Sequence, residues 1–340
     1  MNTLIGSSIP SWPAEPEQGS TPEQRLAWCA AVARWAPSKH NSQPWRFVVR
    51  DGALWVWPDL TRSLPLTDPA QRELVMSCGA AVQLAVVAAG ALGYDLEVTW
   101  TPEPGTTLLA RLSEGRQRPV TQQDRLLLAA AATRRTDRGP LDATTLPPSF
   151  RFELQSAAEA CGGHLRLIAT PAERTQLAEL IAQADRLLVR DGSVDEELAA
   201  WRRGPEDLRG DGVPVDHTRG PAASYRAEFV QRDFSAGSGT YSMDRPGLDA
   251  PLVAVLSTQG DTTQDWLRGG RALAAVLLHA ATLGASSSYL NQPCETPALR
   301  HLLGAGFSIP GHPQVVLRIG IGGTVRPTPR RQLGQVLTVG

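Results

Sequence analysis

The sequence predicts an α+β protein that contains two related halves. Segments typical of helices are interspersed with shorter segments in which apolar and polar residues alternate, as they do in strands. A shift of 191 residues also superposes two apolar helices, each of which stops at a glycine before an extended stretch. The matched residues are Gly79, Ala81, Ala89, Leu92 and Gly93 on Gly270, Ala272, Ala280, Leu283 and Gly284. We therefore expect one fold to occur twice, packed as a pseudo-dimer on its long helices.

The composition is that of an ordinary globular protein. Of 340 residues, 42% are hydrophobic and 20% are charged, which disfavours disorder, and the length suggests about two domains. The formal net charge of −1 gives no general attraction to nucleic acid or to an anionic membrane. Four cysteines occur without a CxxC pair, and HExxH is absent, so we expect neither a metal site nor a disulfide framework.

The N-terminus and the apolar stretches do not predict targeting to a membrane. The first residues have neither a basic start nor a long apolar run, so no signal peptide is expected. The apolar stretches 78–94 and 272–283 are shorter than the ~20 residues that a span needs, and we interpret them as buried helices. A soluble, cytoplasmic protein is the expectation.

The first half is predicted to cover residues 21–120, after an N-terminal arm over 1–20 that contains three prolines. Thr21 and Gln24 have the spacing of a capping box and predict a helix start. Asp51-Gly52 predicts a hairpin turn, because this dipeptide tolerates positive φ. The expected elements are a helix to about 34, a hairpin over 45–57, a buried helix over 73–92 and a strand over 96–100.

The second half is predicted to cover residues 121–340. Thr121 caps one helix, and Thr170 with Glu173 forms the capping box of another. From about 191 to 249, glycine, proline and mixed charge replace any pattern, which is typical of a lid, a functional loop or a disordered insertion. The expected elements are helices over 121–133, 170–190 and 262–283, a short helix from Pro297, and strands over 252–256 and 314–321.

The segment from Ala36 to Phe47 is a polar loop that leads from a helix into a strand. Pro37 and Pro44 stiffen it, while Ser38, Asn41 and Gln43 supply donors and acceptors that can face a planar heterocycle. The alternative is a capped turn in which the Asn and Ser side chains bond to their own backbone.

This loop, read as Ala-Pro-Ser-x-x-Asn-x-Gln-Pro-Trp-x-Phe, resembles the FMN-contacting signature of the nitroreductase-like flavoprotein superfamily. Within it, the similarity is closest to the Acg-type family of FMN-binding proteins, and it extends in order over residues 22–338. The further matching segments are 73–81, 134–138, 289–293, 313–320 and 328–331. The resemblance implies a nitroreductase-like α+β fold, duplicated in one chain, with a lid insertion at about 191–249.

The resemblance also implies the residues that contact FMN. Arg-Arg-x-x-Arg at 134–138 is by itself more often a solvated helix end, but Arg forks match phosphate oxygens well. The family's phosphate contacts map to Arg134, Thr136, Arg138 and the C-terminal pair Arg330 and Arg331, of which Arg331 is preferred. The contacts to the flavin ring map to Pro37, Ser38, Lys39, Asn41 and Gln43, and the stretch that offers a backbone N–H to N5 maps to Leu290, Asn291 and Gln292.

The motifs are distributed unequally between the halves. Only the first half has the Pro-Ser-x-x-Asn-x-Gln loop, whose counterpart would fall near Cys161-Gly-Gly-His164, and only the second half has the arginine motif. One complete composite site, and so one FMN per chain, is therefore expected. The two halves would replace the usual homodimer, with further dimerisation left open.

The implied function is that of an FMN-dependent oxidoreductase. Hydride would pass through flavin N5 between NAD(P)H or an organic substrate and a small acceptor. One alternative is a protein that binds and sequesters FMN without turnover, and another is a scaffold without cofactor. No catalytic side chain is assigned, because flavin hydride transfer does not require a base, although His40 lies beside the flavin loop.

Overall fold

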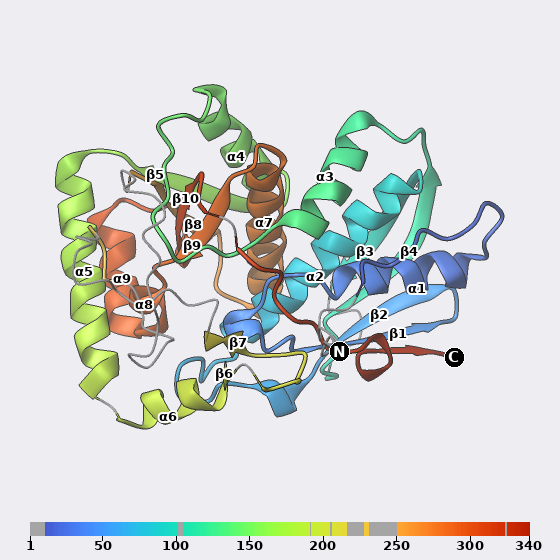
Figure 1. Cartoon of the computed structure of the whole chain (residues 1–340), viewed down its shortest axis with the longest axis horizontal. Helices are drawn as coiled ribbons and strands as arrows, with labels where there is room; N and C mark the ends of the chain where they lie inside the picture. Colours follow the sequence, from blue (N-terminus) through green and yellow to red (C-terminus); the bar gives the residue numbers. More distant parts are fainter. Residues whose placement is uncertain are drawn as a thin grey trace, which may run out of the picture.

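The computed structural model of the chain describes residues 11–100, 105–190, 192–204, 206–215, 228–230, 250–323 and 325–340. It is an α+β structure with one five-stranded sheet, one four-stranded sheet and a small pair of strands (Figure 1). The predicted fold class is therefore confirmed at the level of mixed helices and sheets.

The first sheet has the strand order β11-β1-β2-β4-β3. Its C-terminal strand β11 (Leu337–Val339) pairs in parallel with β1, so the end of the chain returns to the first half. The other elements are α1 (Pro22–Ala33), β1 (Trp45–Arg50), β2 (Ala53–Pro58), α2 (Arg72–Ala91), β3 (Tyr94–Trp100) and β4 (Ala110–Gln117), followed by α3 (Gln122–Thr133).

The second sheet has the strand order β5-β8-β10-β9, with every neighbouring pair antiparallel. The elements of this part are α4 (Ser149–Glu159), β5 (Gly163–Ile168), α5 (Pro171–Arg190), α6 (Gly192–Ala200), β6 (Arg202–Arg203), β7 (Val213–Pro214), β8 (Leu252–Thr258), α7 (Thr263–Thr282), β9 (Ser286–Tyr289), α8 (Gln292–Glu295), α9 (Pro297–Gly306) and β10 (His312–Gly320).

Most predicted elements are present, and their predicted caps are formed. The Thr21 and Thr121 hydroxyls each accept from the backbone N–H three residues on, and the reciprocal side-chain bonds are made as well. The hairpin turn has positive φ at Asp51 (52°) and Gly52 (65°). The expected irregularity of 191–249 is wrong for its first part, which contains α6, β6 and β7. Residues 216–227 and 231–249 lie outside the described residues.

Helices α2 and α7 lie side by side at the centre of the molecule (Figure 1). A Cβ added to Gly79 would lie 2.2 Å from the Leu267 carbonyl oxygen, and one added to Gly270 would lie 1.9 Å from that of Met76. Only glycine permits such backbone contact. The two contacts are reciprocal, because the shift that relates Gly79 to Gly270 also relates Met76 to Leu267.

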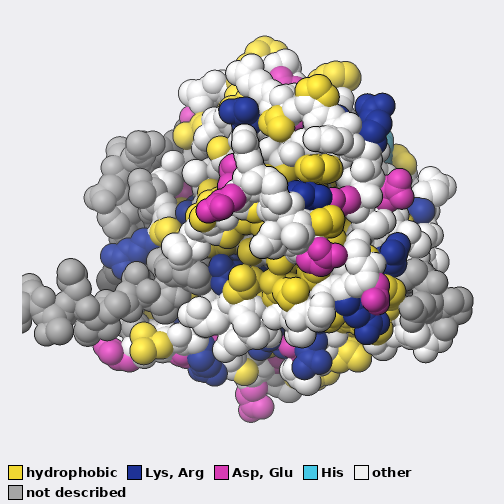
Figure 2. All heavy atoms as spheres, turned by 90° about the vertical axis from the view of Figure 1, so that its right-hand side faces the viewer, with side chains coloured by type: hydrophobic (Ala, Val, Ile, Leu, Met, Phe, Trp, Pro, Cys, Tyr) yellow, Lys and Arg dark blue, Asp and Glu magenta, His cyan; other side chains and the backbone are white. Residues whose placement is uncertain are grey.

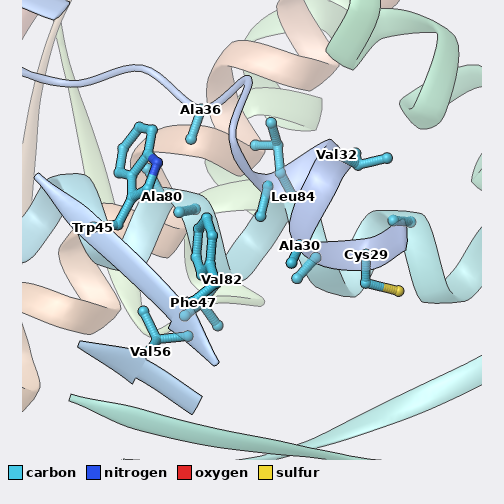
Figure 3. Close-up of a cluster of buried hydrophobic side chains, with 14 of the residues drawn as sticks. Cys29, Ala30, Val32, Ala36, Trp45, Phe47, Val56, Ala80, Val82 and Leu84 are labelled. Atoms are coloured by element: carbon cyan, nitrogen blue, oxygen red, sulfur yellow. The ribbon is translucent and has the colours of Figure 1, made fainter. Parts of the chain in front are cut away.

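The hydrophobic core explains the apolar character of α2. In the first half, Trp45 and Phe47 of β1 and Val56 of β2 pack against Ala80 and Leu84 of α2 (Figure 3). Among the described helices, α2 alone is long and apolar enough to cross a membrane, but 89% of its apolar stretch is buried inside the protein. On the outside, basic and acidic side chains are interspersed around apolar ones, and neither sign of charge dominates this face (Figure 2).

Candidate functional site

A cavity with a volume of about 170 Å³ lies where the loop of the first half meets segments of the second half. Its polar wall is drawn from five stretches of the chain that are far apart in sequence. The lining residues lie within 37–41, 134–138, 212–214, 288–295 and 328–330, and α2 adds Glu73 and Ser77. Its apolar lining comes from Met76 and Ala80 of α2, Leu273 of α7 and Val315 of β10, and it can accept a flat ring.

The loop over 38–43 has an unusual backbone. His40, Asn41 and Gln43 have φ of 49°, 54° and 52°, in the left-handed region that residues other than glycine rarely occupy. Such residues cost about 1–3 kcal/mol each and persist only where the surroundings hold them. The Ser38 hydroxyl accepts from the Gln43 backbone N–H at 3.0 Å, and the Gln43 side-chain oxygen accepts from the Arg331 N–H at 3.0 Å.

One end of the cavity is cationic. Arg134 and Arg330 are 8% and 4% exposed, and neither forms an ion pair within the described part of the chain. Nε and Nη1 of Arg134 and Nε of Arg330 are buried without a hydrogen-bond partner there. Burial, and the guanidinium groups of Arg134, Arg135 and Arg34, lower the pKa of Arg330, and burial lowers the pKa of Arg138 to about 10.

These unmet donors fit a group with several anionic oxygens, such as a phosphate. Asp137, which lies between Arg134 and Arg138 in the sequence, does not fill that role. Its carboxylate accepts from the backbone N–H groups of Gly139 (2.8 Å) and Gly323 (2.9 Å), and so fixes the turn that carries the arginines.

The part of the cavity around Lys39 is charge-balanced instead. Lys39 Nζ lies 2.7 Å from Glu73 Oε2 and 3.1 Å from Glu295 Oε1, and it donates to the Thr67 carbonyl at 2.8 Å. Burial alone would lower the pKa of Lys39, but the Glu295 and Glu73 carboxylates raise it above its ordinary value. Lys39 is therefore a charged residue whose three donors are already used.

Most of the predicted site residues line this one cavity. They are Pro37, Ser38, Lys39, Asn41, Arg134, Thr136, Arg138, Asn291, Gln292 and Arg330. Gln43, Leu290 and Arg331 do not line it. Gln43, at the end of the loop, is fully buried, and the Leu290 N–H donates to the Val316 carbonyl at 3.0 Å.

The preference for Arg331 over Arg330 does not match their placement. Arg331 donates to the carbonyls of Gln43 (3.0 Å) and Gln335 (3.1 Å) and lies 3.5 Å from Asp59, away from the cavity, whereas Arg330 lines it. Adjacent arginines cannot be told apart by a motif that contains both.

Sequence reasoning did not assign several residues that line the cavity. They include Glu73, Met76, Ser77, Tyr289, Glu295 and the segment Gly212–Pro214. Glu73 belongs to the matching segment 73–81, whose apolar pattern predicts only the start of a helix there. Gly212–Pro214 lies in the stretch without a pattern, where the sequence carries no signal. Within the described residues, no three His, Cys, Asp or Glu side chains are grouped to hold a metal ion.

Comparison with known proteins identifies the family. No family model matches the chain. "Putative NAD(P)H nitroreductase acg" of Mycobacterium tuberculosis is 33% identical over 312 residues, which cover 89% of this chain and 92% of the relative. "Putative NAD(P)H nitroreductase Rv3131" of the same organism is 32% identical over 310 residues, 89% and 88% of the two chains. "Uncharacterized protein Rv3127" is 31% identical over 315 residues, 89% and 90%. The chain belongs to the nitroreductase-like family that these relatives represent.

Proposed function

We propose that the protein is an FMN-dependent oxidoreductase. The observation that carries this proposal is the buried cationic end of the cavity, where the Arg134 and Arg330 donors have no carboxylate partner among the described residues. Bound FMN would supply hydride transfer at N5, between NAD(P)H or an organic donor and a small acceptor. The names of two relatives support NAD(P)H as the electron donor.

The chain's own residues would bind and orient the cofactor. Arg134, Thr136, Arg138 and Arg330 would hold the phosphate, with Arg330 replacing Arg331 in this role. Met76, Ala80, Leu273 and Val315 offer an apolar surface to the ring, and Ser38, Asn41, Asn291 and Gln292 offer polar groups at its edges. Since the Leu290 N–H is already bonded, a backbone donor toward N5 would come from Asn291 or Gln292.

We further propose that the two halves are copies of one fold. The strand orders β1-β2-β4-β3 and β5-β8-β10-β9 correspond one to one, and α2 and α7 have the same length of 20 residues. The reciprocal Gly79 and Gly270 contacts have the form of an isologous interface, in which the same patch meets itself. Because only the first half has the loop over 37–43 and only the second half has the arginine motif, two such copies predict one FMN per chain. The absorption spectrum and flavin content of the purified protein measure this. Two FMN per chain would contradict it.

The phosphate assignment is tested by Arg134→Ala and Arg138→Ala. Each should weaken FMN binding by about one to two decades, because a charge-assisted hydrogen bond contributes about 1.5–3 kcal/mol. Arg135→Ala is the matched control, since Arg135 donates to the carbonyls of Ala132 and Arg134 and does not line the cavity. Wild-type FMN affinity in both test variants would place the phosphate elsewhere.

The oxidoreductase assignment itself is tested by turnover. Protein that binds FMN tightly, yet transfers no electrons from NADH, NADPH or dithionite to quinone or nitroaromatic acceptors, would instead be an FMN-sequestering protein. Turnover also depends on access of the acceptor to the cavity. Gly212–Pro214 of the insertion forms part of the cavity wall, which supports a lid role for the described part of that insertion.

A further inference from the structure

We propose that Asp211 is a positioning residue of this site. It fastens the strap formed by Gly210, Asp211 and Gly212 to the first half, and through this strap it holds Asn41 and Arg330 in place. The inference rests on the proposed function, because it concerns retention of the phosphate-bearing cofactor.

The Asp211 carboxylate bridges two parts of the molecule. One oxygen accepts from Arg203 Nε at 3.0 Å and from Nη2 at 2.8 Å, and the other accepts from Arg62 Nη2. Arg203 belongs to the insertion, whereas Arg62 follows β2 in the first half. The Trp201 ring lies beside both cations, with centroid distances of 5.3 Å to Arg62 Cζ and 5.6 Å to Arg203 Cζ. Because the Asp211 side chain is only 13% exposed, water screens these pairs less than surface pairs.

The strap backbone binds the loop over 38–43 directly. The Gly212 carbonyl accepts from Asn41 Nδ2 at 3.0 Å, and the Gly212 N–H donates to the Asn41 carbonyl at 3.2 Å. The Gly210 carbonyl accepts from Gln43 Nε2 at 2.7 Å. Two of the three left-handed residues of the loop are therefore held by the strap on either side of Asp211.

The glycines of the strap permit this close contact. A Cβ at Gly210 would lie 2.2 Å from the Arg330 carbonyl oxygen, and Gly212 has a φ of +73°. Larger residues would push the strap away from the C-terminal segment or strain its backbone. The strap is thus shaped to lie against the loop and Arg330 together.

Asn41 connects the strap to the cationic end of the cavity. Its Oδ1 accepts from Arg330 Nη1 at 3.1 Å, while its Nδ2 donates to the Gly212 and Pro329 carbonyls. The amide is therefore oriented by the strap to present its oxygen to Arg330. When the Asp211 bridge is lost, Asn41 can turn, and Arg330 loses one of the bonds that direct its guanidinium group. The effect should fall on recognition of the phosphate more than on recognition of the ring.

The test compares FMN with riboflavin, which lacks the phosphate. In Asp211→Asn, we expect FMN affinity to fall about tenfold and riboflavin affinity less than about twofold, measured by quenching of flavin fluorescence. Asp207→Asn is the matched control, because Asp207 lies on the same segment and pairs with Arg209 and Arg203 but with none of the described first-half residues. Its ratio of FMN to riboflavin affinity should stay that of the wild type.

Each other outcome has a definite meaning. An unchanged FMN-to-riboflavin ratio in Asp211→Asn, whether or not both affinities fall, overturns the positioning role. Should that variant not fold by circular dichroism, Gly210→Ala tests the same positioning through the contact of the strap with Arg330. Gly204→Ala is its control, because no atom of the described residues lies within 4 Å of a Cβ there. Gly210→Ala should lower the ratio, and an unchanged ratio overturns the proposal. Wild-type protein that binds no FMN would instead refute the proposed function.

Discussion

The two halves differ most in one connection. In the first half, β1 and β2 are joined by the two residues Asp51 and Gly52, whereas the corresponding strands β5 and β8 are joined by residues 169–251. The described part of this long connection reaches back to the first half through Asp211 and Gly212. If the two halves are copies of one fold, as proposed above, this lengthened connection is one of the features by which a symmetric frame would serve an asymmetric site.

A second difference lies just before the first strand of each sheet. Between α1 and β1, residues 34–44 form the loop that contains the buried Lys39 and three residues with a left-handed backbone conformation. Between α4 and β5, only residues 160–162 intervene, and they form a turn. The predicted absence of a second flavin loop near Cys161 is consistent with this turn. Three predictions on stability test how far the two halves are alike.

The largest effect is expected at Lys39, which has no counterpart in the second half. Lys39→Met should lower the free energy of unfolding by about 3–5 kcal/mol, because it leaves buried carboxylates without their shared cation. Urea unfolding followed by circular dichroism measures this. The double variant Lys39→Met/Glu295→Gln should recover part of the loss, since Glu73 keeps its ion pair with Arg72. A loss below about 1 kcal/mol in the single variant would show that the cluster contributes little.

The next effect tests the likeness of the halves. Gly79→Ala and Gly270→Ala should each cost about 1–3 kcal/mol, because the new methyl group would overlap a carbonyl of the facing helix. The two losses should be similar if the contact is reciprocal. Gly304→Ala in α9 is the control, since its Cβ would meet Pro313 at an ordinary 3.5 Å, and helix propensity favours alanine by about 0.5–1 kcal/mol. Sensitivity at only one of the two central glycines would break the comparison.

The sequence predicted what local patterns encode. Thr21 and Thr170 predicted helix starts because a capping box is complete within four residues, and Thr121 did so as a capping side chain. Asp51-Gly52 predicted the hairpin because its signal is equally local. The sequence did not predict α4, because Pro148 precedes this helix and offers no side-chain cap. The sequence did not predict the strap, because the strap is defined by contacts between residues far apart in the chain, such as Asn41 with Gly212. The motif located the arginines, but only side-chain packing distinguishes Arg330 from Arg331.

The smallest effect concerns Asp261, which follows β8 in the second half. Burial alone would raise the pKa of its carboxyl, but hydrogen bonds from Arg300 (2.6 and 2.8 Å), Trp266 (2.7 Å) and Gln314 (3.2 Å) hold it below its ordinary value. A depressed pKa contributes stability above the unfolded-state value of about 4 and loses it as the pH falls through the folded-state value. Asp261→Asn should therefore cost about 1 kcal/mol at pH 7.

The pH dependence separates this charge effect from a packing effect. The difference in unfolding free energy between the wild type and Asp261→Asn should be constant from pH 7 to about pH 5. It should shrink below about pH 4, where the carboxyl of the unfolded wild type takes up a proton while the folded one, with its depressed pKa, stays ionised. Urea unfolding at a series of pH values measures it. A difference that stays constant down to pH 3 would mean that Asp261 contributes through shape and not through its charge.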